Sequence, residues 1–298
     1  MKVNPVLKKL GFSDNDRVMI LHADDLGMAQ SCLAAYREMV EVGPVSAASV
    51  MVPCAWFPQV AAYCRQHPEA DVGVHATLNS EWDNYRWRPL STVDPATGLL
   101  DSEGFFHRRM EETQALADLA AVGRELQAQV EVALAAGIDV THVDTHIGTV
   151  AHPKFIPAYV QLAFQYRVPV MVVRLDEAGF RARGMDSETA AFAAMVVHQL
   201  EEQGLPLFDH LVQFPLDKPD NRLERAIHTL KGLPAGLTHF IIHPAHDTPE
   251  LRDLAATWPS RVADYHTFQS DELRQALRRL GIQVIGYRPL RELLKSGV

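Results

Sequence analysis

Four short groups of histidine and aspartate residues stand directly after apolar stretches of the chain. They are His22-Ala23-Asp24-Asp25, Gly73-Val74-His75, the run from His142 to His146, and His243-Pro244-Ala245-His246. Imidazole and carboxylate groups bind divalent metals and move protons, and α/β proteins gather their active sites at the carboxyl ends of their strands. Four such groups predict one site that carries out metal-dependent or proton-transfer chemistry.

The adjacent carboxylates of Asp24 and Asp25 need an explanation, because two ionised neighbours repel unless a cation or a shared proton compensates. In a regular strand they would point to opposite faces, which disfavours the facing pair of a glycosidase. A turn at Leu26-Gly27 would let Asp25 hold a metal while Asp24 leans over the water bound to it. The alternative is that an aspartate caps a helix over Met28–Val40.

The third group alternates with the period of a strand, so His142, Asp144 and His146 share one side. His146 is last and best placed to bind a metal, whereas Asp144 or His142 would lie one layer below and orient the ligands. His75 also stands near a strand end. Together with Asp25, the two histidines His75 and His146 form a set that leaves coordination positions open for water and substrate.

Three further residues are candidates for catalysis or substrate binding. His243 follows the last clear strand and suits a proton donor to a leaving group, since an imidazole pKa near 6.5 matches neutral pH; alternatively it bonds a neighbouring carbonyl. Arg174 either pairs with Asp24 and sets its protonation, or binds substrate. Trp82 belongs to the aperiodic stretch 80–110, where it either stacks on a sugar ring or anchors the loop.

The elements that would position these residues alternate along the chain. Strands are predicted over Arg17–Ala23, Val45–Val52, Asp71–Leu78, Val140–Thr145, Val168–Leu175, His210–Phe214, Leu237–Ile242 and Ile282–Gly286. Most are apolar on both faces, as in parallel sheets covered by helices. Helical spacing marks Glu111–Ala136, Phe155–Tyr166 and Asp271–Leu280. We therefore predict an α/β fold, a distorted TIM-like barrel of about seven or eight mainly parallel strands, forming a single domain over 1–298 with a loop insertion at about 80–110.

Composition excludes several classes of protein. A net charge of −9 argues against a nucleic-acid partner, because such proteins usually carry a basic face. The chain has no apolar run of membrane-spanning length and no signal-peptide pattern, so we expect a cytoplasmic protein without a membrane partner. Cys32, Cys54 and Cys64 form no CxxC pair, which disfavours disulfides and a cysteine zinc site. The sequence leaves open whether the chain forms a homodimer.

The four motifs, in this order, resemble those of the YdjC-like carbohydrate deacetylases, a family with chito-oligosaccharide deacetylases among its members. Ala23-Asp24-Asp25-Leu26-Gly27 is similar to its Asp-Asp-Phe-Gly turn, and the stretch from Gly73 to Asn79 to its Gly-x-His-x-x-Leu-Thr element. The stretch from Thr141 to His146 is similar to Thr-His-x-Asp-Ser-His, and Ile242-His243-Pro244 to Cys-His-Pro.

The resemblance implies a distorted barrel that removes acetyl groups from an N-acetylated sugar or oligosaccharide. It places the catalytic base on Asp24 and the ligands of one divalent ion, Mg²⁺ or Zn²⁺, on Asp25, His75 and His146. The chain departs from the pattern at Asn79, at Thr145 and over 147–150, where many members carry further histidines. Two other functions stay open: a metal-dependent hydrolase of another bond, such as a phosphoester, and a non-catalytic sugar-binding protein with a vestigial site.

Overall fold

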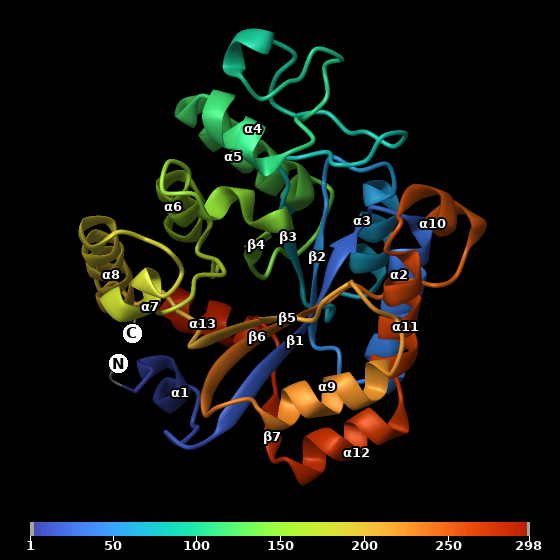
Figure 1. Cartoon of the computed structure of the whole chain (residues 1–298), viewed down its shortest axis with the longest axis vertical. Coiled ribbons are helices and arrows are strands. Elements are labelled where there is room, and N and C mark those ends of the chain that lie inside the picture. The colour runs from blue at the N-terminus through green and yellow to red at the C-terminus, as the bar shows by residue number, and fades with distance from the viewer. Residues whose placement is uncertain (1–2, 297–298) are drawn as a thin grey trace.

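A sheet of seven strands, all parallel where they pair, runs through the middle of the molecule and is surrounded by helices (Figure 1). The computed structural model describes residues 3–296. The strands are β1 (Arg17–Leu26), β2 (Ala47–Val50), β3 (Val72–Ala76), β4 (Val143–Thr145), β5 (His210–Gln213), β6 (Gly236–Ile242) and β7 (Ile282–Val284). Their order is β4-β3-β2-β1-β6-β5, and β7 pairs with the start of β1. The parallel arrangement confirms the predicted α/β class.

The stretch 168–175 closes the sheet into a distorted barrel, but it does so without forming a regular strand. It makes one bridge to β4, where the Met171 N–H donates to Val143 O at 2.9 Å, and one to Phe208, whose carbonyl accepts from the Arg174 N–H at 2.7 Å. The prediction of a strand over Val168–Leu175 is therefore wrong. The segment changes partner after a few residues, and Pro169 has no N–H to donate.

Helices connect most of the strands and cover the outside of the sheet (Figure 1). They are α1 (Pro5–Lys9), α2 (Gln30–Val42), α3 (Phe57–Gln66), α4 (Met110–Leu116), α5 (Leu119–Ala135), α6 (Ile156–Tyr166), α7 (Glu177–Arg181), α8 (Ser187–Glu202), α9 (Arg222–Lys231), α10 (Pro249–Leu254), α11 (Trp258–Phe268), α12 (Asp271–Arg279) and α13 (Arg288–Ser296), with 3-10 turns at 95–97 and 146–151. The helices predicted near 155–166 and 271–280 are confirmed. The one over 111–136 is two helices, because Asp118 breaks the run and caps α5 by accepting from the Ala121 N–H at 2.9 Å.

Alternate residues of β1 face two different layers. Met19 and Leu21 belong to the large core under the helices, whereas Val18 and Ile20 belong to a smaller cluster with Tyr287 on the other face of the sheet. The period of two carries His22 and Asp24 to the same inner face as Ile20. Apolar residues therefore fill the bottom of the barrel, and histidines and carboxylates fill the end where the strands finish. Within residues 3–296, no helix is long and apolar enough to cross a membrane.

Candidate metal centre and active site

The end of β1 is irregular, and this irregularity brings two neighbouring carboxylates to the same side. The pairing of β1 with β2 shifts register between Ala23 and Leu26, and Asp25 has φ 66°, in the left-handed region. Asp24 Oδ2 and Asp25 Oδ1 consequently lie 3.9 and 3.4 Å from the same atom, His75 Nε2. The predicted change of direction exists, but it occurs at Asp25 and not only at Leu26-Gly27. The helix-cap alternative is wrong, because α2 begins after Ala29.

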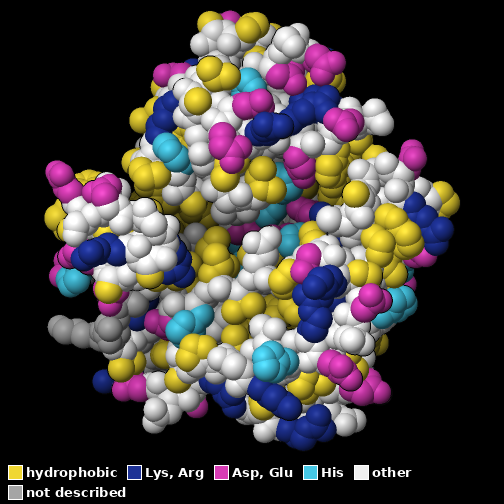
Figure 2. Space-filling model, viewed as in Figure 1, with side chains coloured by type: hydrophobic (Ala, Val, Ile, Leu, Met, Phe, Trp, Pro, Cys, Tyr) yellow, Lys and Arg dark blue, Asp and Glu magenta, His cyan; other side chains and the backbone are white. Residues whose placement is uncertain are grey.

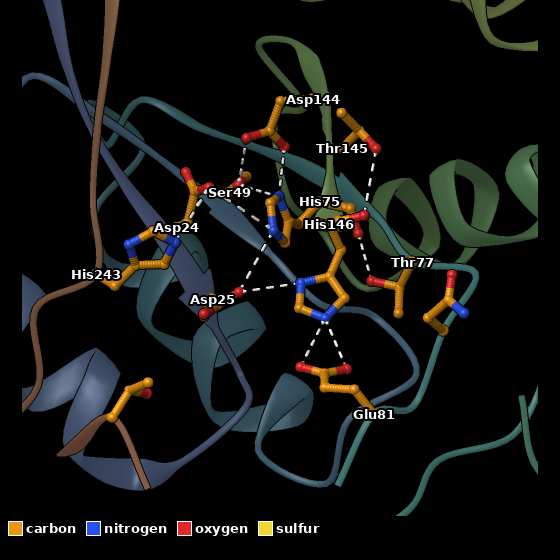
Figure 3. A network of polar contacts seen from close by, with 12 residues as sticks. Asp24, Asp25, Ser49, His75, Thr77, Glu81, Asp144, Thr145, His146 and His243 are labelled. Atoms are coloured by element: carbon orange, nitrogen blue, oxygen red, sulfur yellow. Dashed lines mark hydrogen bonds and ion pairs between the residues drawn. The ribbon is translucent and has the colours of Figure 1, made fainter. Parts of the chain in front are cut away.

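Three buried side chains converge on one point at this end of the barrel (Figure 3). Asp25 Oδ1 lies 3.4 Å from His75 Nε2 and 3.3 Å from His146 Nδ1, and it is a buried oxygen without a hydrogen-bond partner. One atom from each of the three residues lies within 4.8 Å of the others. Two imidazole nitrogens and a carboxylate oxygen are a donor set that divalent metals accept, so the residues present fit the ion that the sequence predicts.

Charges around these side chains shift their pKa values in opposite directions. Burial would raise the pKa of Asp25, but Arg261 and the two histidines hold it well below its usual range. Burial would lower the pKa of both histidines; Asp144 and Asp24 nonetheless raise that of His75 well above its usual value, and Glu81 and Asp25 raise that of His146 to about 9. The carboxylates thus stabilise positive charge at this point, and the same negative charge would stabilise a bound cation.

A further group of atoms fixes the orientation of the candidate ligands. Asp144 Oδ1 lies 2.8 Å from His75 Nδ1, and Asp144 Oδ2 accepts a hydrogen bond from Ser49 Oγ at 3.0 Å. Arg261 Nη1 donates to Asp25 Oδ2 at 2.8 Å, which leaves Oδ1 of that carboxylate for the centre. Such outer contacts orient metal ligands and set which ring nitrogen of a histidine is free. Asp144 therefore lies where the sequence predicts an orienting group.

Asp24 has partners of its own, which differ from those of Asp25. His22 Nδ1 lies 2.7 Å from Asp24 Oδ1, and His22 Nε2 lies 2.8 Å from His142 Nε2, whose Nδ1 is 2.9 Å from Thr141 Oγ1. The sequence predicts that Asp144 or His142 orients the metal ligands, and of these two it is Asp144 that contacts His75. His142 lies behind Asp24, which it reaches through His22.

His243 faces Asp24 from the end of β6. Its Nε2 lies 3.8 Å from Asp24 Oδ2, and its backbone N–H donates to Asp264 Oδ2 at 3.1 Å. The other oxygen of that carboxylate, Oδ1, pairs with Arg222. Burial lowers the pKa of His243 to about 4, against the value near 6.5 expected from the sequence. The side chain is therefore uncharged at neutral pH and must acquire a proton before it can donate one to a leaving group.

Arg174 does not join the group at Asp24. Its guanidinium bonds Glu201 through Nε at 2.6 Å and Asp209 through Nη1 at 2.7 Å. The predicted pairing of Arg174 with Asp24 is therefore wrong. The prediction assumed a regular strand that ends at the rim, whereas the segment 168–175 bends between two partners.

The aromatic residues of the 80–110 segment form one cluster beside the site. The Trp82 ring stacks on Tyr85 at 6.0 Å and meets the edge of Trp87 at 5.8 Å. Tyr85 Oη donates to Met28 O at 2.7 Å, and Trp87 is buried with its Nε1 donating to Asn79 O at 2.7 Å, so both rings anchor the segment. Trp82 and Tyr85 both stay partly exposed, so a substrate could reach either ring.

Glu81 and Arg261 are charged residues of the site that the sequence analysis does not single out. Glu81 places both carboxylate oxygens near His146 Nε2, at 3.1 and 3.0 Å, and Arg261 reaches Asp25 from α11. Glu81 stands two residues beyond the motif that ends at Asn79, which is a weak local signal. For Arg261 no local pattern exists, because its partner is 236 residues away in the chain.

The space-filling view shows a hollow in the middle of one face, where acidic and histidine side chains reach the surface below the 80–110 segment (Figure 2).

Comparison with known proteins agrees with the motifs found around this site. The sequence profile of the YdjC-like protein family matches residues 18–279. The chain belongs to the YdjC-like family.

Two relatives match this YdjC-like protein over most of its length. A carbohydrate deacetylase from Thermus thermophilus is 34% identical over 97% of this chain and 99% of its own. A carbohydrate deacetylase from Thermoanaerobacter pseudethanolicus is 22% identical over 91% of this chain and 98% of its own. A crystal structure from Enterococcus faecalis V583, of a protein provisionally named for cellobiose-phosphate cleavage, covers 92% of this chain and 99% of its own with a TM-score of 0.73 and 18% identity, which shows a shared fold.

Proposed function

We propose that this YdjC-like protein is a metal-dependent carbohydrate deacetylase. It would hydrolyse the amide C–N bond of an N-acetylated sugar or oligosaccharide and release acetate and a free amine. The observation that carries the proposal is the convergence of Asp25, His75 and His146 on one point, with a second carboxylate, Asp24, beside them. The names of the relatives from Thermus and Thermoanaerobacter support the same substrate class.

Asp25 Oδ1, His75 Nε2 and His146 Nδ1 would hold one divalent ion, Zn²⁺ or Mg²⁺. When bound, such an ion lowers the pKa of water and polarises a carbonyl oxygen, so that hydroxide becomes available at neutral pH. The protein itself supplies the orientation of the ligands, because Arg261 fixes Asp25 and Asp144 fixes His75.

In this proposal Asp24 is the residue that accepts a proton. His22 holds one oxygen of its carboxylate, and the other oxygen, Oδ2, faces both His75 and His243 at 3.8 to 3.9 Å. Asp25 cannot take this role while Arg261 occupies one of its oxygens and the metal would occupy the other. The two neighbouring aspartates therefore divide the work of general base and metal ligand.

The reaction then needs one proton to travel from water to the leaving nitrogen. Water attacks the acetyl carbonyl carbon, and Asp24 Oδ2 accepts its proton. His243 is uncharged at neutral pH, so its Nε2 takes this proton from Asp24 and gives it to the sugar nitrogen as the C–N bond breaks. Acetic acid and an amine leave, and both side chains return to their starting protonation states. The acid then loses its proton to the solvent and becomes acetate.

Elemental analysis of the purified protein, combined with acetate-release assays on N-acetylated mono- and oligosaccharides, tests this proposal. We expect about one divalent ion per chain, and equal amounts of acetate and free amine. Phosphate release from phosphorylated sugars without acetate release would favour the phosphoester hydrolase. Sugar binding by a metal-free, inactive protein would favour the vestigial site. A cytoplasmic location and a homodimer stay predictions.

A further inference from the structure

The 80–110 segment brings one charged side chain, that of Glu81, against His146 of the candidate metal centre. Its two carboxylate oxygens lie 3.1 and 3.0 Å from His146 Nε2, the ring atom that points away from Asp25 (Figure 3). His146 is almost completely buried, so water has little access to its ring. Without the Glu81 carboxylate, an N–H group at Nε2 would therefore lack a hydrogen-bond acceptor.

The two histidines of the centre present opposite ring atoms to Asp25. His75 turns Nε2 toward it and has Nδ1 against Asp144, whereas His146 turns Nδ1 toward it and has Nε2 against Glu81. A histidine that binds a cation is a neutral imidazole with one N–H donor and one lone pair, and a carboxylate accepts only from the N–H. Each carboxylate therefore places the lone pair of its histidine at the metal-facing atom.

We infer that Glu81 is a positioning residue of the metal centre, which makes His146 bind the ion through Nδ1. The inference rests on the metal centre of the proposed function. It goes beyond it because one of the three ligands is then oriented from the 80–110 segment, outside the barrel strands, while the other histidine is oriented by Asp144 of β4.

The start of the segment is held firmly enough for Glu81 to orient another side chain. Asn79 Nδ2 and the Ser80 N–H both donate to His107 O at 3.0 Å, and Thr149 Oγ1 donates to Asn79 Oδ1 at 2.6 Å. The two residues that precede Glu81 are thereby tied to His107 and to Thr149, which lies in the same 3-10 turn as His146. The carboxylate is built into the site by these contacts and is not a loose surface charge.

Zinc affinity tests the role of Glu81 directly. We would titrate Zn²⁺ against a competing chelator dye with the full chain and with three variants. Loss of an outer carboxylate typically weakens metal binding about 10- to 100-fold, so we expect that loss for Glu81→Ala and a smaller one for Glu81→Gln, whose amide oxygen can still accept. Glu111→Gln is the matched control, because Glu111 is exposed on α4.

Nitrogen NMR of ¹⁵N-histidine-labelled, zinc-loaded protein gives a second measurement that needs no Glu81 variant to fold. His146 is assigned from the signal missing in His146→Asn. We expect zinc on its Nδ1 and a proton on its Nε2. Zinc on Nε2, or an unchanged zinc affinity in Glu81→Ala, would overturn the inference and leave the proposed function standing. A full-length protein that binds no zinc or magnesium would instead overturn the metal centre itself.

Discussion

Replacing Asp24 and Asp25 by asparagine, one at a time, distinguishes the general base from the metal ligand. Asn has the size of Asp, and in Asp24→Asn its amide oxygen can still accept from His22 Nδ1, so the side chain keeps its place. What is lost is the ability to take up a proton. In Asp25→Asn the oxygen that faces His75 and His146 loses its negative charge, and Arg261 loses its ionised partner.

The expected magnitudes follow from these contacts. General base catalysis contributes about 10²- to 10⁴-fold, or about 3–5 kcal/mol of activation free energy, so Asp24→Asn should lower kcat by that factor with metal affinity unchanged. Asp25→Asn breaks a buried ion pair whose atoms are 2.8 Å apart. Breaking such a pair costs about 3–5 kcal/mol of unfolding free energy, so this variant should be less stable and should lose the metal as well.

Three measurements on each variant decide the matter: metal content after dialysis, acetate release per bound metal, and urea unfolding. The assignment of roles is refuted if Asp24→Asn loses the metal, or if Asp25→Asn keeps full metal affinity. A variant of Asp25 that fails to fold would still leave the result for Asp24, because Arg261 bonds Asp25, and Asp24→Asn keeps its bond to His22.

Three other substitutions give independent checks. His243→Ala should slow amide hydrolysis about 10²-fold or more but spare an activated ester, whose leaving group needs no proton; equal slowing of both would contradict the donor role. Trp82→Ala should raise KM for the sugar about 2- to 10-fold without changing zinc affinity, and an unchanged KM would restrict Trp82 to anchoring. The hydrogen bond from Arg291 lowers the pKa of Asp139 from 3.8 to about 2, so its contribution is present above pH 4 and is lost as the pH falls through 2. The shift corresponds to at most about 2.4 kcal/mol, but the side chain is 51% exposed and solvent screens the pair, so Asp139→Asn should cost about 1 kcal/mol in urea unfolding at pH 7 and less at pH 3.

The parts of the site that sequence predicts are those that depend on strand geometry alone. A period of two turns Asp144 of β4 inward, the parallel order brings His75 of β3 next to it, and His146 follows directly after the end of β4. Both conditions can be stated from residue spacing, because a strand of any sequence alternates its faces. His75, His146 and Asp25 therefore meet in the structure as the motifs predict.

Sequence fails where a regular element is interrupted or where a partner comes from a distant segment. Arg174 was placed at the rim by assuming a regular strand, but the closing segment bends, and the side chain bonds Asp209 and Glu201 instead. Arg261 and Glu81 lie on a helix and on an aperiodic segment, where no spacing rule says which way they point. Their positions follow from tertiary contacts only.

The position of the Asp25 side chain depends both on the local backbone of β1 and on contacts with distant segments of the chain. A regular continuation of β1 would turn this carboxylate outward, toward the core under the helices, where an ionised oxygen would have no compensation. The left-handed conformation at φ 66° is unfavourable for most residues but is tolerated by aspartate, and it turns the side chain inward. Inside, Arg261 compensates one oxygen, and the two histidines face the other. The backbone strain at Asp25 is thus balanced by electrostatic contacts that form only when α11, β3 and the turn after β4 have taken their places. This end of β1 therefore depends on the completed barrel.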